Sequence, residues 1–181
     1  MVEQGIPNPK DGGSNPSAPV KNIIIKEKEC LMNYTYEYPR PVLTVDIAVI
    51  SHDNHILLIK RGREPHKDKW ALPGGHVEMD ETVLEAATRE LKEETGFITS
   101  NSIRLLNVYS RIDRDPRDRY VSVAYWTKVF SRETLTPGDD AADAKWFHIK
   151  DLPELAFDHK EIILDLMFTK IYNSVFSGIK V

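Results

Sequence analysis

The chain has 181 residues, a formal net charge of −4 and 41% hydrophobic residues, which fits one ordinary domain with a core plus an extra segment. The acidic balance argues against a protein that coats nucleic acid, and the single Cys30 excludes an intrachain disulfide and a cysteine metal cluster. No apolar run is long enough to span a membrane and no signal-peptide pattern is present. We therefore expect a cytoplasmic protein that binds neither nucleic acid nor a membrane.

The N-terminal segment is rich in Pro, Gly, Ser and Asn. It has little to bury, so we predict a disordered leader over 1–21 and a folded domain over 22–181; an interaction tail is the alternative for the leader. Residues 22–38 contain an isoleucine triplet and then three tyrosines in alternation, which predicts one or two strands. The tyrosines form a half-exposed sheet face, or they pack on a base or on the second subunit of a homodimer.

Two β-rich runs follow at 40–50 and 55–60, and the turn-forming residues between them predict a hairpin or adjacent strands. A basic loop over 61–69 comes next. A guanidinium can hold a phosphate group with two hydrogen bonds, so the arginines of these segments are candidate substrate contacts: Arg40, Arg61 and Arg63. A plain charged surface is the alternative for the loop arginines.

A glycine turn then leads into a helix. Pro73-Gly74-Gly75 interrupts regular structure and lets the backbone pass close to a ligand. Thr82 to Thr95 contains no Gly or Pro, which predicts a helix there. We expect Asp80 to be its N-cap and Gly96 to follow its last turn.

Helical periodicity sorts the side chains of this segment. At about 100° per residue, the apolar stripe is Val83, Leu84, Ala87 and Leu91, and the solvated face is Glu85, Thr88, Arg89 and Lys92. Glu90, Glu93 and Glu94 lie at the border of the stripe and point towards the rest of the fold. Three carboxylates crowded on a semi-buried edge repel each other, and a divalent cation with all-oxygen ligands, Mg²⁺ or Mn²⁺, removes that problem. The alternative is a solvated helix whose glutamates only add solubility.

The rest of the chain alternates strands and loops before a last helix. We predict strands over 102–111, 120–130 and 144–149, and an amphipathic helix over 158–172. This order predicts an α/β sandwich without an internal repeat. The loop over 112–119 is either a solvated hairpin or a segment that reaches over the substrate with Arg114, Arg117 or Arg119.

One motif joins the glycine turn to the helix. The order G-x5-E-x7-R-E-U-x-E-E-x-G-U, with U a bulky apolar residue, is matched at every fixed position from Gly75 to Phe97. It resembles the Nudix box, the signature of the Nudix hydrolases. The resemblance implies an α/β/α sandwich around a mixed β-sheet. It also implies hydrolysis of a nucleoside diphosphate linked to another moiety.

The resemblance further implies which residues hold the metal. Glu90 and Glu94 are the expected ligands, Glu93 shares the site, and the Gly75 carbonyl joins the coordination. Arg89 is expected to brace a box glutamate by an ion pair, and Glu81 is expected to support the turn.

The proton acceptor is expected to be a carboxylate that takes a proton from a metal-bound water. Glu90 or Glu93 can fill this role, and so can an acid from a later loop. Asp140 is the candidate from the later loop, with Asp139 as the alternative.

Segments outside the box narrow the resemblance to bacterial and archaeal ADP-ribose pyrophosphatases and to related regulators that sense ADP-ribose. These segments are Tyr38–Asp46, Trp70–Gly75, Asp113–Arg117, Gly138–Ala141 and Leu155–His159. Such regulators carry a winged-helix domain after the Nudix domain, and the residues that follow His159 are too few for one. We therefore expect an enzyme whose small-molecule substrate is ADP-ribose, split into AMP and ribose 5-phosphate. The alternatives are a Nudix hydrolase of a nucleoside triphosphate or nucleotide sugar, and a non-catalytic ADP-ribose binding module.

Overall fold

The computed structural model describes residues 36–136 and 141–176. The chain divides into two compact units, Met1–Arg40 and Pro41–Val181. In the first unit, the Arg40 guanidinium lies 4.0 Å from the centre of the Tyr36 ring. The predicted leader, most of the segment in which early strands were expected, and the predicted Asp139 and Asp140 lie outside the described residues.

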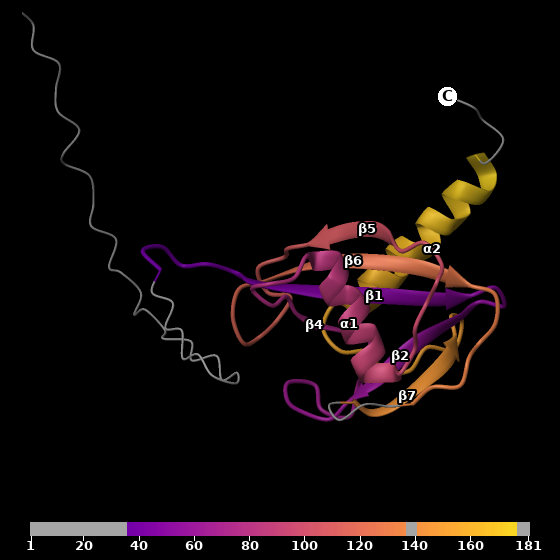
Figure 1. Ribbon diagram of the computed structural model, residues 1–181, viewed down its shortest axis with the longest axis horizontal. Helices are drawn as coiled ribbons and strands as arrows, with labels where there is room; N and C mark the ends of the chain where they lie inside the picture. Colours follow the sequence, from indigo (N-terminus) through magenta and orange to yellow (C-terminus); the bar gives the residue numbers. More distant parts are fainter. Residues whose placement is uncertain (1–35, 137–140, 177–181) are drawn as a thin grey trace, which may run out of the picture. The chain divides into compact units, whose positions relative to one another are not determined.

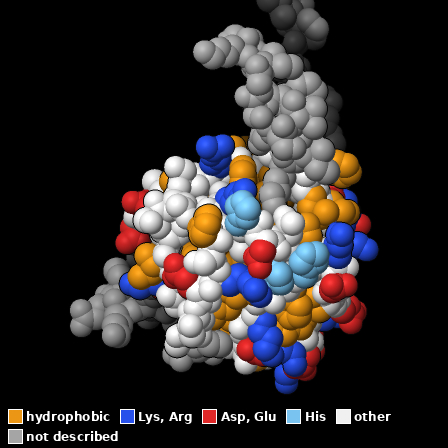
Figure 2. Space-filling model, turned by 90° about the vertical axis from the view of Figure 1, so that its right-hand side faces the viewer, with side chains coloured by type: hydrophobic (Ala, Val, Ile, Leu, Met, Phe, Trp, Pro, Cys, Tyr) orange, Lys and Arg blue, Asp and Glu red, His pale blue; other side chains and the backbone are white. Residues whose placement is uncertain are grey.

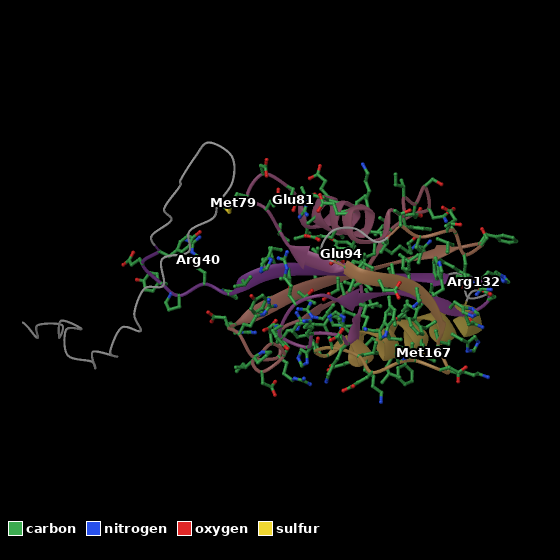
Figure 3. The ribbon with its side chains drawn as sticks, turned by 90° about the horizontal axis from the view of Figure 1, so that it is seen from below. Arg40, Met79, Glu81, Glu94, Arg132 and Met167 are labelled. Carbon is green, nitrogen blue, oxygen red and sulfur yellow. The ribbon has the colours of Figure 1, made fainter. Side chains whose placement is uncertain are left out.

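The second unit is a mixed sheet with one helix on each face. Its strands are β1 (Val42–Ser51), β2 (His55–Arg61), β3 (Trp70–Ala71), β4 (Gly74–His76), β5 (Arg104–Tyr109), β6 (Tyr120–Val129) and β7 (Ala141–His148), and its helices are α1 (Val83–Thr95) and α2 (His159–Phe176). Figures 1 and 3 show α1 and α2 on opposite faces of the sheet. The α/β/α sandwich expected from the sequence is confirmed.

The central strand β1 is apolar on both faces because both are covered. Ile47 and Val49 belong to the core cluster that includes α1 residues, while Ala48 and Ile50 belong to the cluster that includes α2 residues. A strand buried on both sides reads as a continuous hydrophobic run. Asp46, the one charged residue of β1, interrupts that run and is only 7% exposed.

The edge of β1 is shared by two strands. Ile50 pairs with β2 in the predicted antiparallel arrangement, whereas Thr44, Val45 and Asp46 pair with β4. The opposite edge of β1 pairs in parallel with β6. β1 therefore changes its partner along this edge, from β4 near its start to β2 near its end. The glycine turn enters β4 at this change of partner.

Several boundaries differ from the predicted ones. The N-cap of α1 is Thr82, not Asp80, because the Thr82 hydroxyl accepts the Glu85 N–H and the Glu85 carboxylate accepts the Thr82 N–H. Leu84, placed on the apolar stripe, is 42% exposed, and Ala86 is buried instead. The last strand begins at Ala141, three residues earlier than predicted. A small error in helical phase moves a residue from the core to solvent.

Figure 2 looks onto the end of the molecule where β1 turns into β2, and histidine and charged side chains of both signs gather there. Asp53 in that turn lies 3.2 Å from His55 Nδ1 and 3.2 Å from Arg132 Nη2. Within the described part of the chain, no group of three or more His, Cys, Asp or Glu residues is arranged to hold a metal. No helix in residues 36–136 or 141–176 is long and apolar enough to cross a membrane.

Candidate active site

The glycine turn lies directly against the carboxylates of α1. The Gly74 N–H donates to Glu94 Oε2 at 2.9 Å. A Cβ on Gly75 would lie 2.2 Å from Glu90 Oε1, and one on Gly74 would lie 2.1 Å from the Val45 carbonyl oxygen. A side chain at position 74 would collide with the backbone of β1, so Gly74 lets β4 pair closely with β1. A side chain at position 75 would displace the Glu90 carboxylate.

Arg89 holds the acidic residues of the site in place. Its Nε and Nη2 donate to the two oxygens of Glu81 at 2.9 and 2.6 Å. Its Nη1 donates to Glu90 at 2.9 Å and to Glu93 at 3.0 Å, and Nη2 also reaches the His76 carbonyl. The helical wheel had placed Arg89 on the solvated face, which is wrong. The ion pair implied by the family resemblance is present.

Burial sets the electrostatics of this cluster. Burial raises the pKa of Glu94 to about 8, and the negative charges of Glu90 and Asp46 raise it further. The hydrogen bond from the Gly74 N–H acts in the opposite direction and lowers the pKa. Burial also raises the pKa of Glu90, although Arg89 opposes the shift. Ionised carboxylates in such surroundings need a positive partner.

A divalent cation fits Glu90 and Glu94, since both are desolvated, both are oxygen donors, and each lies against the backbone of the glycine turn. Glu93 differs, because it is 58% exposed and ion-paired to Arg89. The described carboxylates therefore do not yet form a three-ligand set. Figure 3 shows Glu94 on the α1 side of the sheet.

Two predicted arginines converge beside this cluster. The guanidinium carbons of Arg61 and Arg117 lie 4.8 and 5.7 Å from the centre of the Phe157 ring. Arg117 also lies 4.7 Å from the Tyr120 ring centre. Burial and the nearby positive charge of Arg117 lower the pKa of Arg61, whereas the negative charge of Glu94 opposes this shift. Two guanidiniums held close together near a carboxylate cluster suit a ligand with several negative charges.

The hydrogen bonds of Arg61 go to backbone carbonyls, those of Pro65 at 2.9 Å and Arg63 at 3.5 Å. Arg117 pairs with Asp115 at 2.6 Å. Burial alone would raise the pKa of Asp115, but the hydrogen bonds from Arg117 more than offset it and lower that pKa. Arg61 thus makes no ion pair with a carboxylate of the described residues.

Arg114 has a different role from the other arginines of its loop. It is 7% exposed, and its Nε and Nη2 donate to the two oxygens of Asp158 at 2.9 and 2.8 Å. Arg117 makes the same kind of bidentate pair with Asp115, but its side chain is 40% exposed, whereas Arg114 and its partner Asp158 are both buried. A ligand can reach Arg117 more readily than Arg114. We therefore leave Arg114 out of the proposed substrate contacts, although the sequence had grouped it with them. Arg63 and Arg40 stay predictions.

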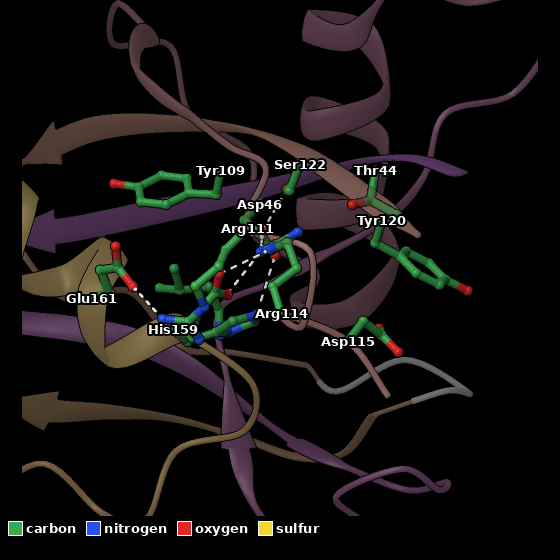
Figure 4. A network of polar contacts seen from close by, with 12 residues as sticks. Thr44, Asp46, Tyr109, Arg111, Arg114, Asp115, Tyr120, Ser122, His159 and Glu161 are labelled. Carbon is green, nitrogen blue, oxygen red and sulfur yellow. Dashed lines mark hydrogen bonds and ion pairs between the residues drawn. The ribbon is translucent and has the colours of Figure 1, made fainter. Parts of the chain in front are cut away.

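An interior polar network, which the sequence reasoning missed, lies under the site (Figure 4). Asp46 accepts a hydrogen bond from Ser122 and lies 3.4 Å from His159 Nε2 and 3.5 Å from Arg114 Nη2. His159 Nδ1 accepts the Leu72 N–H at 2.8 Å. One signal was present, because a lone aspartate in an apolar strand needs buried partners. The partners themselves come from distant segments.

Comparison with known proteins identifies the family. A NUDIX domain model matches residues 40–166. Over 144 residues the chain is 49% identical to an ADP-ribose pyrophosphatase of Methanocaldococcus jannaschii, covering 80% of this chain and 82% of that protein. The NUDIX domain of Shewanella oneidensis NrtR, crystallised with ADP ribose, matches with a TM-score of 0.69 and 27% identity over 73% of this chain and 90% of that one.

A third relative is a bifunctional NMN adenylyltransferase/ADP ribose pyrophosphatase from Francisella tularensis, complexed with AMP and a manganese ion. It matches with a TM-score of 0.66 and 31% identity, over 74% of this chain and 43% of that one. The matched domain spans both the glycine turn and the whole carboxylate helix. The carboxylates of the Nudix box lie against the glycine turn. From the matched domain and the 49% identical relative, the chain belongs to the NUDIX family.

Proposed function

We propose that this protein is a Nudix hydrolase that splits ADP-ribose into AMP and ribose 5-phosphate, using Mg²⁺ or Mn²⁺. The observation that carries the proposal is the placement of two desolvated carboxylates, Glu90 and Glu94, with Arg61, which interacts electrostatically with Glu94, and with Arg117 next to Arg61. A diphosphate needs both kinds of group, one to hold a cation and one to hold its remaining oxygens. The 49% identity to a protein named ADP-ribose pyrophosphatase supports the substrate.

The chain's own residues would act as follows. Glu90, Glu94 and the Gly75 carbonyl hold the cation, with Glu93 as a further ligand. When bound, the cation cancels phosphate charge and lowers the pKa of a water molecule. Arg89 keeps Glu90 in place through its 2.9 Å ion pair.

The substrate contacts proposed are Arg61 and Arg117, which would orient the diphosphate through oxygens that face away from the cation. The proton from the attacking water passes to a carboxylate, for which Glu90, Glu93 and Asp140 stay the predicted acceptors. Cytoplasmic location, a homodimer and the absence of nucleic-acid and membrane partners also stay predictions from the sequence.

A substrate panel tests the proposal. Phosphate release, coupled to a phosphatase, is measured for ADP-ribose, NADH, diadenosine polyphosphates, nucleotide sugars and 8-oxo-dGTP, in protein dialysed against EDTA and then given Mg²⁺ or Mn²⁺. We expect ADP-ribose to have the highest kcat/KM, with AMP and ribose 5-phosphate as products and no activity before metal is added. Full activity in EDTA would overturn the metal role. At least tenfold higher kcat/KM for 8-oxo-dGTP, about 1.4 kcal/mol of transition-state binding, would overturn the substrate.

A non-catalytic ADP-ribose binding module is the second candidate function. The match to the NUDIX domain of NrtR, which was crystallised with ADP ribose, favours it. The intact set of box glutamates and their brace favours catalysis, since binding alone does not need all three. Tight binding of ADP-ribose in Mg²⁺ without turnover would decide for the binding module.

A further inference from the structure

The strand that precedes the glycine turn, β3, is hydrogen-bonded to the segment that precedes α2. Trp70 N–H donates to the Glu154 carbonyl at 3.1 Å, and Ala156 N–H donates to the Trp70 carbonyl at 2.8 Å. Trp70 and Leu155 form a parallel bridge. If this parallel ladder continued for two more residues, the Leu72 N–H would donate to the Ala156 carbonyl.

The ladder stops there because the chain turns away. Phe157 has a φ of 51°, in the left-handed region that a bulky side chain rarely adopts. The Ala156 carbonyl accepts the His159 N–H at 3.3 Å instead. The buried Leu72 N–H is left without a backbone acceptor, and His159 Nδ1 takes that place at 2.8 Å.

This contact fixes the protonation of His159. Since Nδ1 accepts a hydrogen bond, the ring is neutral and carries its proton on Nε2, which faces Asp46 Oδ1 at 3.4 Å. Burial lowers the pKa of His159, in agreement with a neutral ring. The imidazole therefore spans the space between Asp46 and the peptide of Leu72, and the same Asp46 oxygen would be 3.0 Å from a Cβ on Gly74.

Leu72 is two residues from the group that contacts Glu94. Pro73 lies between them with its φ fixed by the ring, and its carbonyl accepts the Ile47 N–H at 2.8 Å. Gly74 then donates its N–H to Glu94 Oε2 at 2.9 Å. Leu72, Pro73 and Gly74 therefore form one short segment in which each peptide is hydrogen-bonded, from His159 at one end to Glu94 at the other.

We infer that His159 is a positioning residue, whose Nδ1 replaces a missing backbone acceptor for Leu72 and thereby holds Gly74 where it orients Glu94 for the metal. This inference rests on the proposed metal site at Glu90 and Glu94. Partners that orient a metal ligand typically change metal affinity or activity by about 10- to 100-fold when they are removed. His159 acts through the backbone and does not itself touch substrate.

The test compares three substitutions that keep different parts of the imidazole. His159→Asn keeps an oxygen acceptor near the position of Nδ1, His159→Gln moves its amide towards Asp46, and His159→Ala removes both. Ile163→Ala is the matched control, because Ile163 is 1% exposed on the same helix and in the same core cluster as Leu72, and its aliphatic side chain can form no hydrogen bond. Thermal unfolding, Mn²⁺ binding to substrate-free protein, and the Mg²⁺ concentration for half-maximal ADP-ribose turnover are measured for all.

We expect His159→Ala and His159→Gln to weaken Mn²⁺ binding and Mg²⁺ activation together by at least about tenfold, with the KM for ADP-ribose at saturating Mg²⁺ changed less than about threefold. His159→Asn should lie within about threefold of the unsubstituted protein in both metal constants. Ile163→Ala should lower the Tm without changing the metal constants.

Equal metal constants in His159→Gln and Ile163→Ala, or a His159→Asn protein as impaired as His159→Gln, would overturn the inference. These outcomes are distinct from failure of the proposed function. If the unsubstituted protein binds no Mn²⁺ and needs no metal for turnover, the metal site itself is wrong and the inference falls with it.

Discussion

Arg61 is the residue whose surroundings point most directly to an anionic ligand. It is partly desolvated and beside a second guanidinium, and among the described residues its hydrogen bonds go only to backbone carbonyls. Arg61→Met should lower kcat/KM for ADP-ribose by roughly 10- to 100-fold, mainly through KM, because one charge-assisted hydrogen bond contributes about 1.5–3 kcal/mol.

Arg132→Met is the control for this substitution. Its guanidinium is paired with Asp53 in the turn after β1, so steady-state kinetics should show kcat/KM within about twofold of the unsubstituted protein, as for other surface changes. Equal losses for Arg61→Met and Arg132→Met would mean that net charge, and not a local contact, attracts the substrate.

Glu94 combines a proposed metal-binding role with a cost to the metal-free fold. Glu94→Gln keeps an acceptor for the Gly74 N–H but removes the charge, and we expect kcat to fall by roughly 10²- to 10³-fold, as for one lost electrostatic contact. Glu85→Gln keeps the capping acceptor of α1 and should leave kcat nearly unchanged in the same assay. Comparable losses at both positions would place the metal elsewhere on the helix.

The same substitution should stabilise the metal-free protein. The folded-state pKa of Glu94, about 8, lies above its ordinary value of 4.5, so its contribution to stability is present at low pH and is lost as the pH rises towards 8. In thermal unfolding with EDTA at pH 8.5, Glu94→Gln should have the higher Tm. Saturating Mg²⁺ should reverse the order, because only the unsubstituted protein binds it well. A Glu94→Gln protein that is less stable in EDTA would contradict the buried-charge account.

At the scale of one element, α1 begins with a capping box. Thr82→Ala removes the hydroxyl that accepts the Glu85 N–H at 3.3 Å and should cost about 0.5–2 kcal/mol, or about 2–4 °C in Tm per kcal/mol for a domain of this size. Asp80→Ala is the control, since Asp80 is exposed and does not belong to the capping box formed by Thr82 and Glu85. A larger fall in Tm for Asp80→Ala than for Thr82→Ala, measured by calorimetry, would mean that Asp80 is the N-cap, as predicted from the sequence.

The sequence predicted the elements well where local pattern decides them. The span of α1 and the β1–β2 pairing follow from spacing and from turn-forming residues. The prediction that Glu93 points into the fold like Glu90 and Glu94 is wrong, because its side chain is 58% exposed. The helical wheel failed for Arg89 because it treats each side chain as a radial vector. A long guanidinium instead reaches back along the helix to Glu81, eight residues earlier, where five donors find carboxylate and carbonyl partners.

At the scale of the whole molecule, the decisive contacts lie far apart in the chain. His159 and Leu72 are 87 residues apart, and Asp46 and Ser122 are 76 apart. No sequence periodicity links such distant pairs. Asp46 therefore indicates that buried polar partners exist, but the sequence does not predict which residues they are. The polar interior under the site joins β1, β6, the loop before β6 and the start of α2 into one network.

This network makes global stability depend on pH through His159. Burial holds its folded-state pKa below the ordinary value of 6.5, so between these two values the unfolded chain binds more protons and stability is lost as the pH falls. His159→Asn keeps an acceptor for Leu72 but cannot titrate. Denaturant unfolding of both proteins from pH 7.5 to 5 should show the unsubstituted protein losing stability relative to His159→Asn by up to about 1.4 kcal/mol per pH unit below about 6.5. Glu94 is common to both proteins, so its opposite pH dependence cancels in the difference. A difference that stays constant across this range would mean that His159 has the same pKa in the folded and unfolded chains, which would contradict its burial as a neutral acceptor for the Leu72 N–H.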